Sequence, residues 1–148
     1  GGGDGQGYNI NIPMEGGIGD ADYTVALERL ILPALEQFSP DMLFIDLGVD
    51  GHFADPLAGM RLTSRGHVEL AGALMDAAGG LCEGRCAVLL EGGYDLPALS
   101  EVCAGVVARS VGTSVDLRLS VAGEPATFDP GPVARALKGH WELGGRSR

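Results

Sequence analysis

Two short segments of the chain carry side chains that could take part in catalysis. Asp50, His52 and Asp55 fall within six positions of one another, and Tyr94 follows the glycine pair Gly92-Gly93. A carboxylate can bind a divalent metal ion, and a catalytic zinc site normally takes three protein ligands. A phenol can donate a hydrogen bond to a carbonyl oxygen as that oxygen gains negative charge. The segments therefore hold a candidate metal ligand and a candidate electrophilic group.

Each of these residues also has a purely structural interpretation. An aspartate in a loop, such as Asp50, commonly forms a turn or caps a helix. Tyr94 could simply pack over a turn. In the functional interpretation, the two glycines before it let the backbone approach a substrate closely. One loop cannot easily supply all three ligands of a zinc site, so the two segments must be judged together.

Both segments follow apolar runs of strand length, at 42–48 and 86–90. The first run is expected to form a strand that is covered on both faces. Apolar residues at helical spacing predict helices between these runs and around them, over 20–38, 63–80 and 96–111. Alternating strands and helices predict an α/β fold with a parallel, doubly wound sheet, whose ligands gather outside the carboxyl ends of the strands.

The remaining pattern adds weaker elements. Residues 8–12 alternate like a short strand, and 133–143 could form a closing helix. Asp20 is the expected cap of the first helix, and Pro33 should bend or break that helix near its last turns. Thr63 is the expected cap of the second helix, which Gly79-Gly80 should end. The other histidines, His67 and His140, fall in predicted helices away from the strand ends. We find no internal repeat and expect one domain, with a core over 1–111 and a C-terminal connection and closing helix over 112–148.

Composition limits the function classes. Twenty acidic and ten basic residues give a net charge of −10, which disfavours nucleic acids and anionic membranes and suits a cationic substrate. No apolar run is long enough to span a membrane. The three cysteines have no CxxC spacing, so we expect buried free thiols and a reducing cytoplasm.

Four ordered motifs point to a known family. Gly48-Val49-Asp50 precedes Asp55-Pro56-Leu57, then Leu62-Thr63, then Glu91-Gly92-Gly93-Tyr94. Their order and spacing resemble the C-terminal portion of the histone deacetylase and acetylpolyamine amidohydrolase superfamily. Residues 5–13 and 17–20 look like the family's preceding segment, and His140-Trp141 resembles the end of bacterial class II-like members. The resemblance is dense over 3–111 and fainter up to 143.

The resemblance implies a fold and a site. The fold would be the arginase-deacetylase α/β fold, with 1–148 as the C-terminal part of a single deacetylase domain. Asp50 would bind Zn²⁺, or another divalent metal, and Tyr94 would polarise the substrate carbonyl. Leu57, Gly92 and Gly93 would bind the substrate along its acyl channel. By the same resemblance His52 is a loop residue rather than a ligand, and Asp55 shapes the turn before Pro56.

The implied activity is zinc-dependent hydrolysis of amides, which removes acetyl groups from acetyl-lysine or acetylpolyamine-type substrates. The family's paired histidines and its other two zinc ligands are expected upstream of Gly1, so we expect the 148 residues alone to be inactive. The alternative is a non-catalytic deacetylase-like module that binds acetylated or cationic ligands. A nucleotide-binding α/β domain ranks last, because Gly1 to Gly7 precedes a strand instead of following one. The oligomeric state, including a homo-oligomer, stays open.

Overall fold

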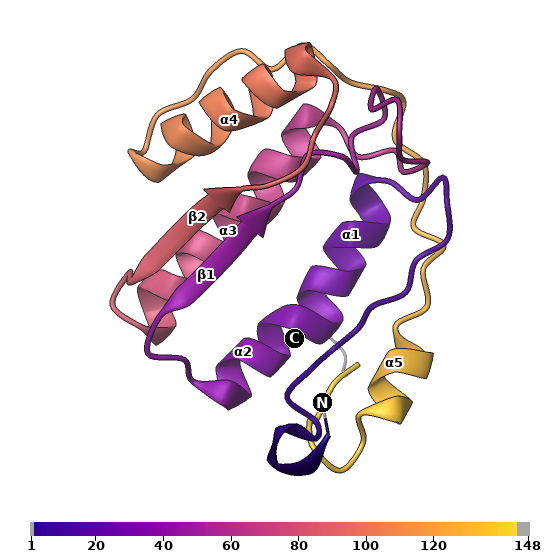
Figure 1. The fold of residues 1–148 in the computed structure, drawn as a ribbon, viewed down its shortest axis with the longest axis vertical. Helices are drawn as coiled ribbons and strands as arrows, with labels where there is room; N and C mark the ends of the chain where they lie inside the picture. Colours follow the sequence, from indigo (N-terminus) through magenta and orange to yellow (C-terminus); the bar gives the residue numbers. More distant parts are fainter. Residues whose placement is uncertain (1, 145–148) are drawn as a thin grey trace.

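The computed structural model describes residues 2–144, and its centre is a strand-helix-strand unit (Figure 1). Strand β1 spans Leu43–Leu47, helix α3 spans Ser64–Leu81 and strand β2 spans Cys86–Leu90. The strands are parallel and in register from the pair Leu43 and Cys86 to the pair Leu47 and Leu90. Both predicted strands are confirmed, and their carboxyl ends lie at the same edge of the sheet.

The first long helix contains a change of winding. Helix α1 spans Asp20–Ala26, a π-helical segment η2 spans Leu27–Ile31, and α2 spans Leu32–Phe38. Proline lacks an N–H and clashes with the preceding turn, and a π-helical turn is one way to absorb that conflict. The helix therefore continues past Pro33. Gly19, rather than Asp20, occupies the N-cap position.

Helix α3 and helix α4, which spans Leu96–Ser110, have caps that fix where they begin. The hydroxyl of Thr63 accepts a hydrogen bond from the backbone N–H of Gly66, which confirms Thr63 as the predicted cap. The carboxylate of Asp95 similarly accepts from the N–H of Ala98. Helix α3 runs to Leu81, past the two glycines that were expected to end it, because neither glycine adopts a left-handed conformation there.

The main core lies where α3 and α4 pack on the end of β1. Its buried side chains come from these three elements and from the loop after β1: Leu47, Val49, Ala71, Ala98, Val102 and Val106. Helices α1 and α2 contact α3 as well, and Leu30 in η2 is fully buried. These contacts hold the strand ends, and the loops that follow them, in fixed positions.

The opposite face of β1 is bare among the described residues. Ile45 and Leu47 are buried, whereas Phe44 is 64% exposed. Leu89, on the same face of β2, is also exposed. The expectation that β1 is covered on both faces is therefore not met within 2–144.

The ends of the described chain pack against each other. The short 3-10 helix η1 spans Gly3–Gly5, and residues 9–15 form no strand, so the strand predicted over 8–12 is wrong. The indole N–H of Trp141 donates to the carbonyl of Gly7, and the Tyr8 and Trp141 rings meet edge to face. Helix α5 covers only Gly131–Ala136, shorter than predicted, because the chain turns before His140.

Two further expectations concern the cysteines and the membrane, and one further contact holds the C-terminal connection. The cysteines are free, with Cys82 buried and Cys86 and Cys103 half-buried. The carboxylate of Asp22 accepts hydrogen bonds from the backbone of Thr127 and Phe128, which fastens the C-terminal connection to α1. Within residues 2–144, every helix is too short or too polar to cross a membrane.

Packing between α3 and α4 yields a test with two matched glycines. A Cβ at Gly105 would lie 2.5 Å from Cγ2 of Val68, whereas one at Gly79 would meet nothing within 4 Å. We expect Gly105→Ala to lower the free energy of unfolding by about 1 to 2 kcal/mol, because overpacking outweighs the gain in helix propensity. Gly79→Ala should raise it by up to about 1 kcal/mol. Urea unfolding measures both, and equal effects would contradict the packing described.

Candidate active site

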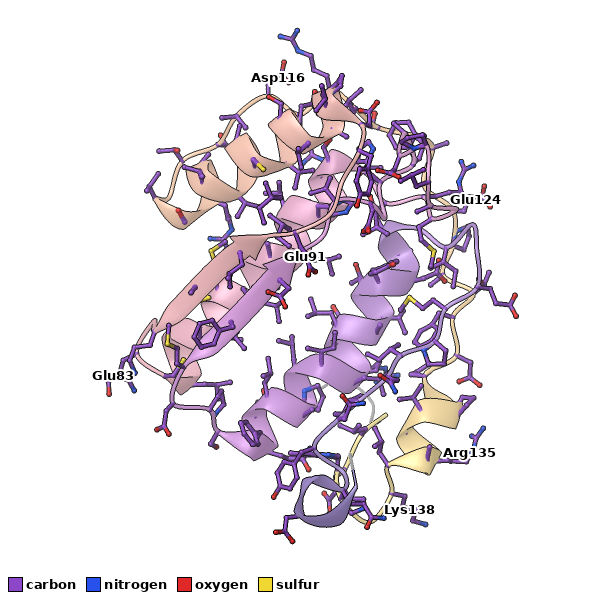
Figure 2. All side chains as sticks on the ribbon, in the orientation of Figure 1. Glu83, Glu91, Asp116, Glu124, Arg135 and Lys138 are labelled. Carbon is purple, nitrogen blue, oxygen red and sulfur yellow. The ribbon has the colours of Figure 1, made fainter. Side chains whose placement is uncertain are left out.

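Backbone pairing continues past the ends of β1 and β2 and brings the two candidate loops together. The N–H of Glu91 donates to the carbonyl of Leu47 at 3.1 Å, and the N–H of Val49 donates to the carbonyl of Gly92 at 2.8 Å. Figure 2 shows Glu91 at the point where β2 leaves the sheet. The segments that hold Asp50 and Tyr94 therefore start side by side at one edge.

The Asp50 side chain faces the second loop. Its Oδ2 atom lies 2.8 Å from the position that a Cβ of Gly92 would occupy, so only glycine leaves this space open. Asp50 is exposed, and its carboxylate has no hydrogen-bond partner among residues 2–144. An exposed carboxylate whose oxygens are not used by the protein is suited to bind a cation.

Tyr94 and Leu57 are held by their backbones rather than by packing of their side chains. Tyr94 is 59% exposed and Leu57 is 73% exposed. Gly93 precedes Tyr94 with φ = 129°, and a Cβ there would lie 2.8 Å from Cβ of Val49, so the loop requires glycine at this position. The N–H groups of Tyr94 and Leu57 both donate to the carboxylate of Asp55. The expectation that Asp55 shapes its turn agrees with these contacts.

His52 is a buried structural residue beneath the first loop. It is fully buried, its Nε2 lies 3.2 Å from Oγ of Ser64, and its Nδ1 accepts from the N–H of Ala54. These partners place the ring proton on Nε2. Burial lowers the pKa of His52, an effect that the neighbouring His67 increases. The ring therefore stays neutral and supports the loop from below.

His67 lies close to the candidate site, so the expectation that it sits away from the strand ends is wrong. Its ring centroid is 5.9 Å from that of His52, and its Nε2 is 3.9 Å from the Cβ position of Gly51, the residue after Asp50. The hydroxyl of Tyr23 is 3.8 Å from the same point. Burial raises the pKa of Tyr23, and the charge of Asp50 adds to this effect.

Sequence patterns gave little signal for these neighbours. His67 stands four residues after the cap Thr63, and its Nδ1 donates to the Thr63 carbonyl at 2.9 Å. His67 thus lies in the first turn of α3, and this position could have placed it near the carboxyl ends of the strands. Tyr23 carries no such signal, because its place depends on how α1 packs against α3.

The described residues hold an open carboxylate rather than a complete metal site. Within 2–144 no group of three or more histidine, cysteine, aspartate or glutamate side chains is arranged to hold a metal ion. The Asp50 carboxylate is open, but a zinc site needs about two further ligands. The described residues could therefore form only part of a metal site.

Comparison with known proteins identifies the fold and the family. The histone deacetylase domain matches residues 1–110. The chain belongs to the histone deacetylase family. It is 39% identical over 110 residues to "Histone deacetylase 10, chloroplastic" from Oryza sativa subsp. japonica, across 74% of this chain and 25% of that protein. It is 36% identical over 129 residues to the "Probable deacetylase" of Archaeoglobus fulgidus, across 86% of this chain and 35% of that protein.

Solved structures of deacetylases share the fold. The crystal structure of the HDA15 HD domain gives a TM-score of 0.73 at 32% identity, covering 91% of this chain and 37% of that one. The histone deacetylase Clr3 gives 0.79 at 27% identity, covering 98% of this chain and 24% of that one. The predicted arginase-deacetylase fold is thus confirmed. The chain spans about a quarter of the Oryza sativa relative and about a third of the Archaeoglobus fulgidus relative.

Contact between Asp50 and Gly92 can be tested directly. We expect Gly92→Ala to force the Asp50 carboxylate into another rotamer, because a Cβ at 2.8 Å from Oδ2 is closer than real contacts allow. Gly59→Ala is the control, since a Cβ there would meet nothing within 4 Å. Crystal structures of both variants provide the measurement. An unmoved Asp50 carboxylate in Gly92→Ala would show that the two loops are further apart than described.

Proposed function

We propose that this chain supplies Asp50 and Tyr94 to a zinc-dependent deacetylase that removes acetyl groups from acetyl-lysine or acetylpolyamine-type substrates. One observation carries the proposal: the open carboxylate of Asp50 faces Gly92, two residues before Tyr94, at the carboxyl edge of a parallel sheet. Such an edge is where α/β folds bind ligands. The two relatives described above are a histone deacetylase and a probable deacetylase by name.

The donor set fits zinc in part. Asp50 would contribute one oxygen ligand, and the remaining ligands would come from outside the described residues. Zinc bound there would polarise the acyl carbonyl and activate a water molecule. A single carboxylate does not hold zinc tightly, so we expect residues 1–148 alone to be inactive.

Tyr94 would stabilise the developing charge. Its hydroxyl has no hydrogen-bond partner among residues 2–144, so it is available to donate to the acyl oxygen. A donor that is already positioned in a site closed to water contributes about 3 kcal/mol to the transition state. The Asp55 contact to the Tyr94 backbone would supply this positioning.

Proton transfer needs a base that the described histidines do not provide. His52 and His67 are buried and hydrogen-bonded to the protein. His140 lies in the turn after α5, where its ring borders Gly7. The proton from water would therefore pass to a histidine elsewhere in the complete protein.

The proposed substrate class rests on the family match and on the net charge. Leu57, Gly92 and Gly93 would border a narrow channel for an alkyl chain that ends in an acetamide. The net charge of −10 favours substrates with positive charge, such as polyamines or lysine-rich segments, and disfavours nucleic acid. The products would be acetate and a free amine.

The role of Tyr94 can be measured by acetate release. We expect Tyr94→Phe in the complete protein to lower kcat by about a hundredfold, because the variant loses only the donor to the acyl oxygen. Zinc content should remain the same as in the natural protein. Unchanged kcat would refute the proposed role. Tight binding of acetylated amines by the natural protein, with no turnover, would favour the alternative of a non-catalytic binding module.

The role of Asp50 calls for a comparison with a second aspartate. We expect Asp50→Asn to weaken zinc binding by more than about a hundredfold, since even the partners of metal ligands contribute ten- to a hundredfold. Asp46→Asn is the matched control, because Asp46 is an exposed aspartate in β1. Competition with a chromogenic zinc chelator measures the zinc affinity of the two variants of the complete protein. Equal affinities of the two variants would exclude Asp50 as a ligand.

A further inference from the structure

One carboxylate joins the two loops of the candidate site. Oδ1 of Asp55 accepts from the N–H of Leu57 at 2.9 Å and from that of Ala58 at 3.3 Å. Oδ2 of the same residue accepts from the N–H of Tyr94 at 2.7 Å. Asp55 is only 7% exposed. Each oxygen thus serves a different loop, away from competing water.

We propose that Asp55 is a positioning residue that sets the Tyr94 hydroxyl against the channel formed by Leu57. The inference rests on the proposed function, because it concerns the geometry of that site. The side chains of Tyr94 and Leu57 are largely exposed, so packing does not fix them. The first half of the second loop is held by Glu91 and Gly92, whose backbones bond to the end of β1. Beyond Gly93, Asp55 provides the hydrogen-bonded link between the loops within residues 2–144.

The charge state of Asp55 suits this role. Burial acts to raise the pKa of its carboxyl group, but hydrogen bonds from the backbone of Leu57, Tyr94, Ala58 and Asp95 outweigh burial and hold the pKa below its usual range. The group is therefore an anion with two accepting oxygens at neutral pH. Hydrogen bonds to a charged acceptor are stronger than hydrogen bonds to a neutral one.

An amide cannot reproduce the arrangement. The side chain of asparagine has one accepting oxygen, and its NH₂ group only donates. In Asp55→Asn the oxygen should stay with Leu57 and Ala58, since two N–H groups converge there. The NH₂ group would then face the N–H of Tyr94, donor against donor. The variant should release Tyr94 while it keeps the turn at Leu57.

Hydrogen exchange tests this prediction without relying on activity. In the complete protein, we expect Asp55→Asn to speed exchange of the Tyr94 amide by about tenfold or more, with little change at Leu57. Asp95→Asn is the control: it removes the same charge next to Tyr94, and asparagine caps a helix as well as aspartate does. Unchanged exchange at Tyr94 in Asp55→Asn, or equal acceleration in Asp95→Asn, would overturn the inference.

A double-mutant cycle then separates positioning from general loss of stability. We expect Asp55→Asn to lower kcat about tenfold or more in the natural background and much less in the Tyr94→Phe background, because the hydroxyl it positions is already gone. Zinc content should not change. Equal losses in both backgrounds would mean that Asp55 acts through stability alone and would overturn the inference. If Tyr94→Phe itself has no effect, the proposed function fails, and the exchange result still decides whether Asp55 ties the loops.

Discussion

The arrangement depends on the parallel register of two strands. Leu47 and Leu90 are paired, and the hydrogen bonds of Glu91 and Val49 carry that pairing one step beyond the strands. Because the carboxyl ends of parallel strands lie at one edge, the residues that follow them must meet there. A slip of one residue would turn the side chains of one strand to the opposite face and separate Asp50 from Gly92.

The sequence predicted the elements that have strong local signals. The apolar run at 86–90 and the cap at Thr63 match the structure, because β-branched and apolar runs and capping hydroxyls act over a few residues. Where the prediction depended on distant contacts it was less accurate. Residues 8–12 alternate as a strand does, yet they pair with no strand among the described residues.

The sequence likewise predicted some residues of the candidate site and missed others. Ordered motifs led to Asp50, Tyr94 and the glycines, whose positions at one edge agree with the structure. The buried side chains beneath them could not be predicted from the sequence, because they come together only where α1 and α3 meet the first loop. His67 and Tyr23 come from these two helices, and only the packing of the helices brings them next to Gly51. Asp55 was expected to shape a turn, but its second oxygen reaches 39 residues along the chain.

The π-helical turn explains an unusual spacing of buried residues. Asp22, Ala26, Leu30 and Ala34 are all buried, and each lies four residues after the one before. In a regular α-helix, with about 100° per residue, three such steps would rotate the buried stripe by about 120° around the axis. A π-helical turn takes up one extra residue and removes about 100° of that rotation. The stripe therefore stays straight, and deleting a single residue from this turn would twist the second half of the helix away from its neighbours.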